Sequence, residues 1–135
     1  MNRDKTSLPR DAAGFNYIRR NIKRGATNRD LEWTLSDDDL KDIIVCPCFY
    51  CGSDPYNIVR EMQQMYSPSR MKWNGIDRVD SSKGYVQGNI VPCCTQCNYM
   101  KRNYSQESFI EKARAIALRH PKVSATGGMS AGLLA

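Results

Sequence analysis

Apolar residues recur at helical spacing near the start of the chain. Phe15, Ile18 and Ile22 predict a helix over residues 12–24. Gly25 follows directly and is expected to end this helix, because glycine is a common helix-stop residue. The first element is therefore expected to be a helix with one apolar face.

A second helix is predicted after Ser36, which is a good N-cap, and a short strand over residues 31–35 is expected to lead into it. Three aspartates at positions 37–39 fall in its first turn, where the helix dipole favours negative charge. Three consecutive aspartates also resemble an acidic metal site, but a helix start is the better explanation. The buried face of this helix is expected to consist of Leu40, Ile43 and Ile44.

A final helix is predicted after Ser105, which is again suited to capping. Its inner face is expected to consist of Phe109, Ile110, Ala113, Ile116 and Ala117. Upstream, residues 75–80 alternate as in a short strand, and residues 85–86 are a candidate for the returning strand. Residues 53–73 contain prolines and serines and are interpreted as a loop-rich insertion.

These patterns predict an α+β protein in three parts. Residues 1–45 are expected to form a helical and strand support segment, and residues 46–120 the main domain. Residues 121–135, rich in Ser, Gly and Ala, are expected to form a disordered tail. A chain of 135 residues buries only a small core, so a structural metal would compensate.

The chain has neither a secretory signal nor an apolar run long enough to span a bilayer. We therefore expect an intracellular protein, cytoplasmic or nucleoid-associated, with no membrane partner. Its six cysteines are then expected to be reduced and available for metal.

The sequence is basic, with 20 Lys and Arg against 14 Asp and Glu and a formal net charge of +6. This excess is compatible with binding a polyanion such as DNA. A solvated charged surface is about as good an explanation for any single cluster. The clusters comprise Arg19, Arg20, Lys23 and Arg24, then Arg60, Arg70 and Lys72, and finally Lys101 and Arg102.

Two Cys-x-x-Cys pairs predict a zinc site. Cys48 and Cys51 form the first pair, and Cys94 and Cys97 the second. Four thiolates from two short turns suit tetrahedral zinc, and a closed shell of four sulfurs makes the zinc structural. Two further cysteines lie beside the pairs, and Cys46-Pro47-Cys48 offers an alternative ligand. Cys46 and Cys93 lack the two-residue spacing, so we interpret them as small packed residues.

The motifs from the first cysteine pair onwards resemble those of the HNH endonucleases, the His-Me finger or ββα-metal group. The resemblance is greatest to zinc-containing, phage-type, endonuclease VII-like members and covers roughly residues 46–118. It implies a small, zinc-stabilised, treble-clef-like ββα-metal domain flanked by N-terminal helices and a C-terminal helix. The stretches that carry it are Cys48-Phe49-Tyr50-Cys51-Gly52, Asn74-Gly75-Ile76-Asp77-Arg78-Val79-Asp80, Lys83-Gly84-Tyr85, Asn89-Ile90-Val91-Pro92 and Cys94-Thr95-Gln96-Cys97-Asn98-Tyr99-Met100-Lys101.

The resemblance also implies roles for individual residues. Asp77 and Asn98 fall where the family binds its catalytic Mg²⁺ or Mn²⁺ ion, and Asn89 falls on the asparagine that shapes the loop. Arg78 stands where the family has its general-base histidine. We expect contacts to nucleic acid from Arg70, Lys72, Lys83, Lys101 and Arg102.

Arginine cannot take a proton near neutral pH, so Arg78 is a departure with consequences. Another group can serve as base, such as Asp80 or a hydroxide bound to the metal. Alternatively, Arg78 stabilises charge on the phosphate, or the fold has lost cleavage and kept binding. The chain's one histidine, His120, is better explained as a partner of a helix C-terminus.

Two functions follow from these observations. The first is a metal-dependent endonuclease that cleaves DNA phosphodiester bonds, with weak activity if the base is missing. The second is a non-catalytic zinc module that binds nucleic acid or assembles with a partner protein or a second copy of itself.

Overall fold

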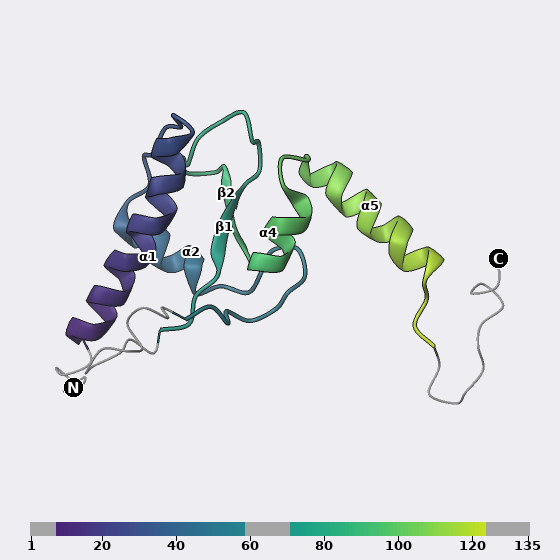
Figure 1. Cartoon of the computed structure of the whole chain (residues 1–135), viewed down its shortest axis with the longest axis horizontal. Helices are drawn as coiled ribbons and strands as arrows, with labels where there is room; N and C mark the ends of the chain where they lie inside the picture. The colour runs from purple at the N-terminus through teal and green to yellow at the C-terminus, as the bar shows by residue number, and fades with distance from the viewer. Residues whose placement is uncertain (1–7, 59–70, 124–135) are drawn as a thin grey trace.

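A computed structural model describes residues 8–58 and 71–123 (Figure 1). Arg60 and Arg70 therefore lie outside the described residues, as do most of the predicted insertion and tail. The chain is α+β, as predicted. Its elements are α1 (Leu8–Asn28), α2 (Asp37–Ile44), β1 (Gly75–Arg78), β2 (Ile90–Cys93), α4 (Thr95–Lys101) and α5 (Gln106–Arg119).

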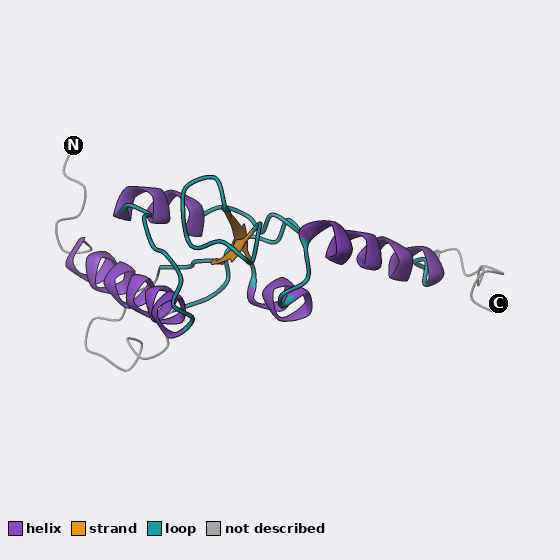
Figure 2. Ribbon diagram, turned by 90° about the horizontal axis from the view of Figure 1, so that it is seen from above, coloured by secondary structure: helices purple, strands orange, loops and turns teal. Residues whose placement is uncertain are grey.

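The sheet is a two-stranded antiparallel ladder in which Asp77 of β1 lies opposite Val91 of β2. α1 and α2 lie on one side of this hairpin and α4 on the other, as Figures 1 and 2 show. α5 leads away from the hairpin in both views. The returning strand thus begins at Ile90, and the prediction of a return at residues 85–86 was wrong.

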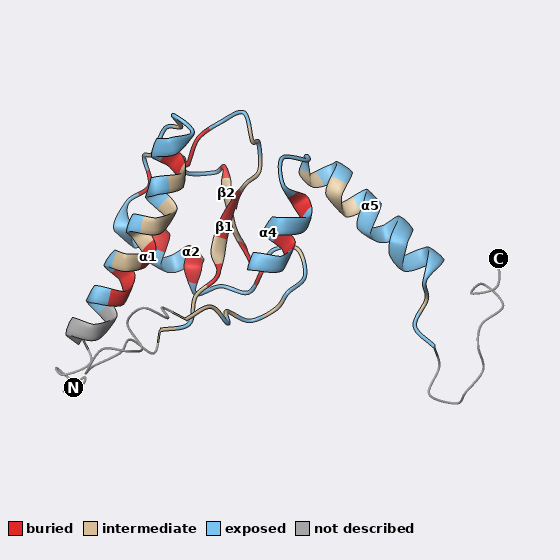
Figure 3. Ribbon diagram, viewed as in Figure 1, coloured by how far each residue is buried: buried red, intermediate tan, exposed pale blue. Residues whose placement is uncertain are grey.

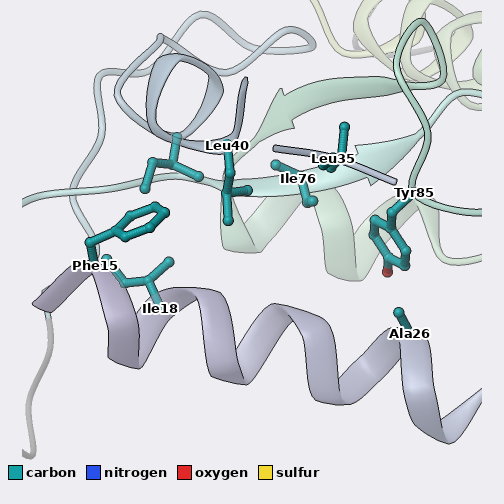
Figure 4. Packing of buried hydrophobic residues seen from close by; sticks show 8 residues of the cluster. Phe15, Ile18, Ala26, Leu35, Leu40, Ile76 and Tyr85 are labelled. Atoms are coloured by element: carbon teal, nitrogen blue, oxygen red, sulfur yellow. The ribbon is translucent and has the colours of Figure 1, made fainter. Parts of the chain in front are cut away.

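One apolar core joins the first helices to the hairpin (Figure 4). Side chains from α1 and α2 meet Ile76 of β1 and Tyr85 of the loop that follows. Figure 3 shows the buried positions gathered along the inner sides of these elements. The core consists of Phe15, Ile18, Ala26, Leu35, Leu40, Ile44, Ile76 and Tyr85.

The backbone of the segment after α1 lies very close to the backbone of Gly84 and Tyr85, at the edge of this core. The Tyr85 amide donates to the carbonyl of Glu32 at 2.7 Å, and the Thr34 amide donates to the carbonyl of Tyr85 at 3.0 Å. Gly84 lies at the crossing, where a Cβ atom would stand 2.4 Å from the Glu32 carbonyl oxygen. Only glycine fits there. Residues 31–35 form an isolated bridge between Trp33 and Tyr85, not the predicted strand.

The predicted caps of α2 and α5 are confirmed, but α1 begins at Leu8 and ends at Asn28, beyond both ends of the predicted 12–24 helix. Ser36 caps α2 in a capping box with Asp39, and Ser105 caps α5. α1 runs through Gly25 to Asn28, because Gly25 is tolerated in the helix at a cost that packing on both sides of it offsets. The chain leaves α1 through Asp30, which has a φ of 54°.

The predicted inner face of α5 is not packed. None of its fourteen residues, all of them described, is buried, and Ile116 is 52% and Leu118 83% exposed. Phe109 is partly covered, because its ring packs edge to face against the Tyr50 ring, with 5.2 Å between the ring centres. No helix in the described part of the chain combines the length and apolar character needed to cross a bilayer.

Candidate functional site

The two cysteine pairs meet in one cluster. The sulfurs of Cys48, Cys51, Cys94 and Cys97 all lie within 4.8 Å of one another, and the Cys51 and Cys94 sulfurs are 3.7 Å apart. A tetrahedral zinc with bonds of about 2.3 Å requires sulfur separations of about 3.8 Å. The four cysteines are thus positioned to hold a metal ion, and the all-sulfur shell suits structural zinc.

Backbone hydrogen bonds hold both pairs in place. The Gly52 amide donates to the Cys48 carbonyl at 2.9 Å, and Gly52 takes a positive φ of 76° to close the turn. The Phe49 amide donates to the Pro92 carbonyl at 2.8 Å, which ties the first pair to β2. Cys94 caps α4, and its sulfur accepts from the Cys97 amide at 3.4 Å.

The thiols of the cluster differ in their readiness to ionise. A hydrogen bond with the Ser53 hydroxyl, 3.2 Å away, and a further one from the Ser53 backbone lower the pKa of Cys51 to about 6. Burial, reinforced by neighbouring sulfurs, raises the pKa of Cys97 well above its ordinary value. Cysteine binds metal as the thiolate, so a dication would stabilise the charged form of these crowded sulfurs.

Cys46 and Cys93 lie outside the cluster, as the spacing predicted. Cys93 is buried, and its sulfur contacts the carbonyl of Cys94 at 3.5 Å. Cys46 is exposed, so the expectation that it is a packed residue was wrong. Its sulfur donates to the carbonyl of Asp42 at 3.0 Å, so Cys46 contacts the last turn of α2 from the surface.

A cleft of about 610 Å³ opens between α1, β1 and α4. Asp77 and Arg78 line it from β1, and Asn98 and Arg102 line it from α4. Arg29, just beyond α1, completes a set of three guanidinium groups. The fold therefore brings Asp77, Arg78 and Asn98 to one cavity, which is where the family resemblance puts its catalytic residues.

Asp77 is buried and fully engaged by neighbouring donors. The Lys101 ammonium lies 3.1 Å from Oδ2 and 3.3 Å from Oδ1, and the Tyr50 hydroxyl donates to Oδ2 at 2.6 Å. Burial, together with this hydrogen bond, raises the pKa of Tyr50, so the phenol remains a donor. The role of Asp77 and Asn98 in binding a divalent ion stays a prediction.

The structure corrects the expected position of Lys101. Lys101 was expected to contact phosphates, but its side chain is almost wholly buried, and its ammonium pairs with Asp77. Lys72, Lys83 and Arg102 are exposed and accessible to a polyanion. Lys83 lies 3.9 Å from the Asp80 carboxylate, a loose surface pair.

Arg78 supports the loop that follows β1. Its Nη1 donates to the carbonyl of Ser81 at 2.5 Å and to that of Lys83 at 2.9 Å. The guanidinium lies 5.5 Å from the centre of the Tyr85 ring, a cation–π contact. Arg78 is thus tied to the loop's backbone while it lines the cleft.

Asn89 binds the same loop from the other side. Its Oδ1 accepts from the Asp80 amide at 2.9 Å, and its Nδ2 donates to the carbonyls of Asp80 at 3.1 Å and Gly84 at 2.8 Å. Asp80 in turn accepts from the amide and hydroxyl of Ser82, which lower the pKa of its carboxyl. The loop is held in one shape from both ends.

Three cleft or near-cleft residues were not predicted from the sequence. Tyr50 lies between the two cysteines of the first pair, and nothing in its spacing indicates contact with Asp77. Arg29 donates to the Tyr85 hydroxyl at 3.2 Å, a contact between residues 56 positions apart. Asn74 is buried and donates to the carbonyl of Cys46 at 2.9 Å, which joins α2 to β1.

Comparison with known proteins gives one sequence relative and one structural neighbour. No family model matches the chain. Over 110 residues, which are 82% of this chain, it is 32% identical to an uncharacterised protein of Acanthamoeba polyphaga mimivirus. The chain spans 18% of that protein's length, so it corresponds to a small part of a much larger polypeptide.

The structural neighbour is the rare-cutting HNH restriction endonuclease PacI, which exhibits an unusual mechanism of DNA perturbation. The two structures agree with a TM-score of 0.56 and 21% sequence identity over 77% of each chain. The chain has an HNH endonuclease fold. This confirms the predicted small ββα-metal domain, and at this level of identity the likeness concerns the fold alone.

Proposed function

We propose that this chain is a metal-dependent endonuclease that cleaves DNA phosphodiester bonds inside the cell, in the cytoplasm or the nucleoid. The observation that carries the proposal is the cleft, which Asp77 from β1 and Asn98 from α4 both line within an HNH-type fold. Arg29, Arg78 and Arg102 surround the same cavity with positive charge suited to a phosphate backbone.

The residues present fit a divalent cation. Asp77 offers carboxylate oxygens and Asn98 an amide oxygen, and Mg²⁺ and Mn²⁺ prefer oxygen ligands. Such an ion supplies charge stabilisation at the phosphate and at the leaving oxygen. The Lys101 ammonium and the Tyr50 hydroxyl orient the Asp77 carboxylate.

The protein's own candidates for a base are poorly placed. Arg78 cannot accept a proton, and its guanidinium donates to two loop carbonyls. Asp80 accepts two hydrogen bonds from Ser82 and is not among the residues that line the cleft. We therefore expect slow cleavage, in which Arg78 contributes positive charge and loop rigidity.

A non-catalytic module that binds nucleic acid is the second candidate. One observation favours it: the Asp77 carboxylate already has a buried cationic partner in Lys101. In such a module, the Lys101 ammonium takes the place of a divalent ion beside Asp77, and the arginines of the cleft bind phosphates. Because the chain corresponds to a small part of its viral relative, assembly with further domains or with a second copy is compatible with either function.

A plasmid assay separates the two functions. Zinc-loaded protein is incubated with supercoiled plasmid and Mg²⁺ or Mn²⁺, and an endonuclease gives nicked circles that EDTA abolishes. Asp77→Ala should lose this activity, whereas Asp42→Ala, which removes an exposed acid from α2, should retain it. Intact DNA binding without nicking in any metal would favour the binding module.

A further inference from the structure

α1 presents three distinct surfaces. Its first surface packs into the core through Phe15, Ile18 and Ala26. Its second surface forms a wall of the cleft through Asn21 and Gly25, which are one helical turn apart. The same helix therefore carries part of the core and part of the candidate active site.

The third surface is a basic hollow of about 540 Å³. Its six lining residues are all polar, and four carry positive charge. Each of them has another member of the set three or four positions away, so together they form one stripe along the helix. The residues of this basic stripe are Asn16, Arg19, Arg20, Lys23, Arg24 and Thr27.

The charges of the basic stripe are not all equally available. Arg19 donates to Asp37 of α2 at 2.6 Å and to Asn16 at 3.0 Å, so its charge is largely neutralised. Lys23 lies 5.8 Å from the centre of the Trp33 ring but is exposed. Arg20 and Arg24 are exposed and four residues apart, which makes them the natural anchors for an anion.

Geometry links the basic stripe to the cleft. Asn21 lines the cleft and Arg24 lines the basic hollow, and the two residues are three positions apart, so they are neighbours on the surface of α1 and the two surfaces adjoin there. Four residues of helix rise about 6 Å. One DNA strand carries a charge every ~3.4 Å of its axis, so two long side chains at this spacing can reach neighbouring phosphates.

We propose that the basic stripe binds the phosphate backbone of the same nucleic acid that enters the cleft. This inference rests on the proposed function only in taking nucleic acid as the ligand. Arg20 and Arg24 make the contacts, with Lys23 beside them, and they add affinity without reading sequence. The stripe extends the binding site from the hairpin onto α1, outside the region that carries the family motifs.

The test compares two pairs of charge removals. Arg20→Gln with Arg24→Gln removes two charges from the basic stripe, and Lys112→Gln with Arg114→Gln removes two from α5, on the other side of the hairpin (Figure 1). All four residues are exposed helix positions, and glutamine keeps helix propensity. Binding to a fluorescent duplex is measured by anisotropy over a range of salt concentrations, in EDTA-free buffer without divalent ions.

We expect the stripe variant to bind more weakly and with a plot of log K against log salt shallower by about 2, one for each phosphate contact. The α5 variant should keep the original slope. Equal losses in both variants would mean that net charge alone matters, and no loss in the stripe variant would also overturn the proposal.

The result is independent of catalysis. Plasmid nicking with an unaltered salt slope in the stripe variant would uphold the endonuclease and refute the stripe. A reduced slope in a protein that nicks no plasmid would uphold the stripe and leave the binding module as the function.

Discussion

The ammonium of Lys101 lies 3.1 Å from the Asp77 carboxylate, with side-chain exposures of 1% and 8%. This ion pair joins α4 to β1, and its Asp77 also lines the cleft. Burying a charge costs free energy unless an opposite charge is buried beside it, so each member of this pair depends on the other. Tyr50 completes it by donating a third hydrogen bond, 2.6 Å long, to Asp77.

Removing one partner of this pair should therefore cost more than removing both. We expect Lys101→Met or Asp77→Asn to lower the free energy of unfolding by about 3–5 kcal/mol, because each leaves a buried group unpaired. The double variant should recover much of that loss. Urea denaturation of the zinc-loaded proteins measures it as a double-mutant cycle.

The exposed pair of Lys83 and Asp80 is the control, because water and salt screen a surface ion pair. Lys83→Met should leave the free energy of unfolding nearly unchanged. A Lys101→Met variant as stable as the wild type would contradict the importance of the buried pair.

Metal analysis should find about one zinc per chain. Cys97→Ala should abolish it and leave the protein insoluble or without fixed tertiary structure, because zinc binding contributes an apparent ~10–16 kcal/mol in finger peptides. Cys46→Ala is the matched control, since Cys46 lies outside the cluster. Elemental analysis and circular dichroism check both variants, and a folded, zinc-free Cys97→Ala protein would refute the structural role.

The parts of the fold that sequence predicted depend on local chemistry. Ser36 and the three aspartates after it predicted the start of α2, because capping and the helix dipole act within the first turn. The cysteine spacing predicted the metal cluster for the same reason. Asn89 was expected to shape its loop, and its three hydrogen bonds reach residues within nine positions.

The parts that sequence did not predict depend on tertiary contacts. The periodicity of α5 indicated an inner face, but periodicity does not reveal whether another element covers that face. Lys101 looked like a surface cation until the fold brought it against a carboxylate 24 positions away. Gly25 looked like a helix end, yet packing of α1 on both sides of it outweighs its low helix propensity.

Gly84→Ala should destabilise the protein by about 1–3 kcal/mol or more, because the new methyl group would overlap the Glu32 backbone. Gly25→Ala should have the opposite effect, a gain of about 0.5–1 kcal/mol. Its Cβ would lie in helix α1 with its nearest neighbour at 3.9 Å. Chemical denaturation of both variants measures whether the free energy of unfolding falls in Gly84→Ala and rises in Gly25→Ala. Equal effects at the two positions would rule out a special backbone approach at Gly84.

Arg78→His should raise plasmid nicking if Arg78 stands where a base is missing. A positioned base typically contributes ~10²–10⁴-fold, although the lost loop hydrogen bonds will offset part of the gain. Arg78→Gln removes the charge without adding a base and should give no increase. Asp77→Ala should abolish activity, and all three variants should retain DNA binding.

Initial rates of nicking, measured beside duplex binding, decide between the outcomes. Fast cleavage by the wild type that falls in both Arg78→His and Arg78→Gln would mean that the guanidinium itself assists the reaction. Our account of a missing base would then be wrong.

Cys94 has two functions in one residue, and this couples distant parts of the molecule. Its sulfur belongs to the metal cluster and also caps α4, the helix that carries Asn98 and Arg102 into the cleft. A chelator that never enters the cleft would therefore act on it allosterically, through the first turn of a seven-residue helix. Loss of zinc would thus disturb the cleft and the fold together.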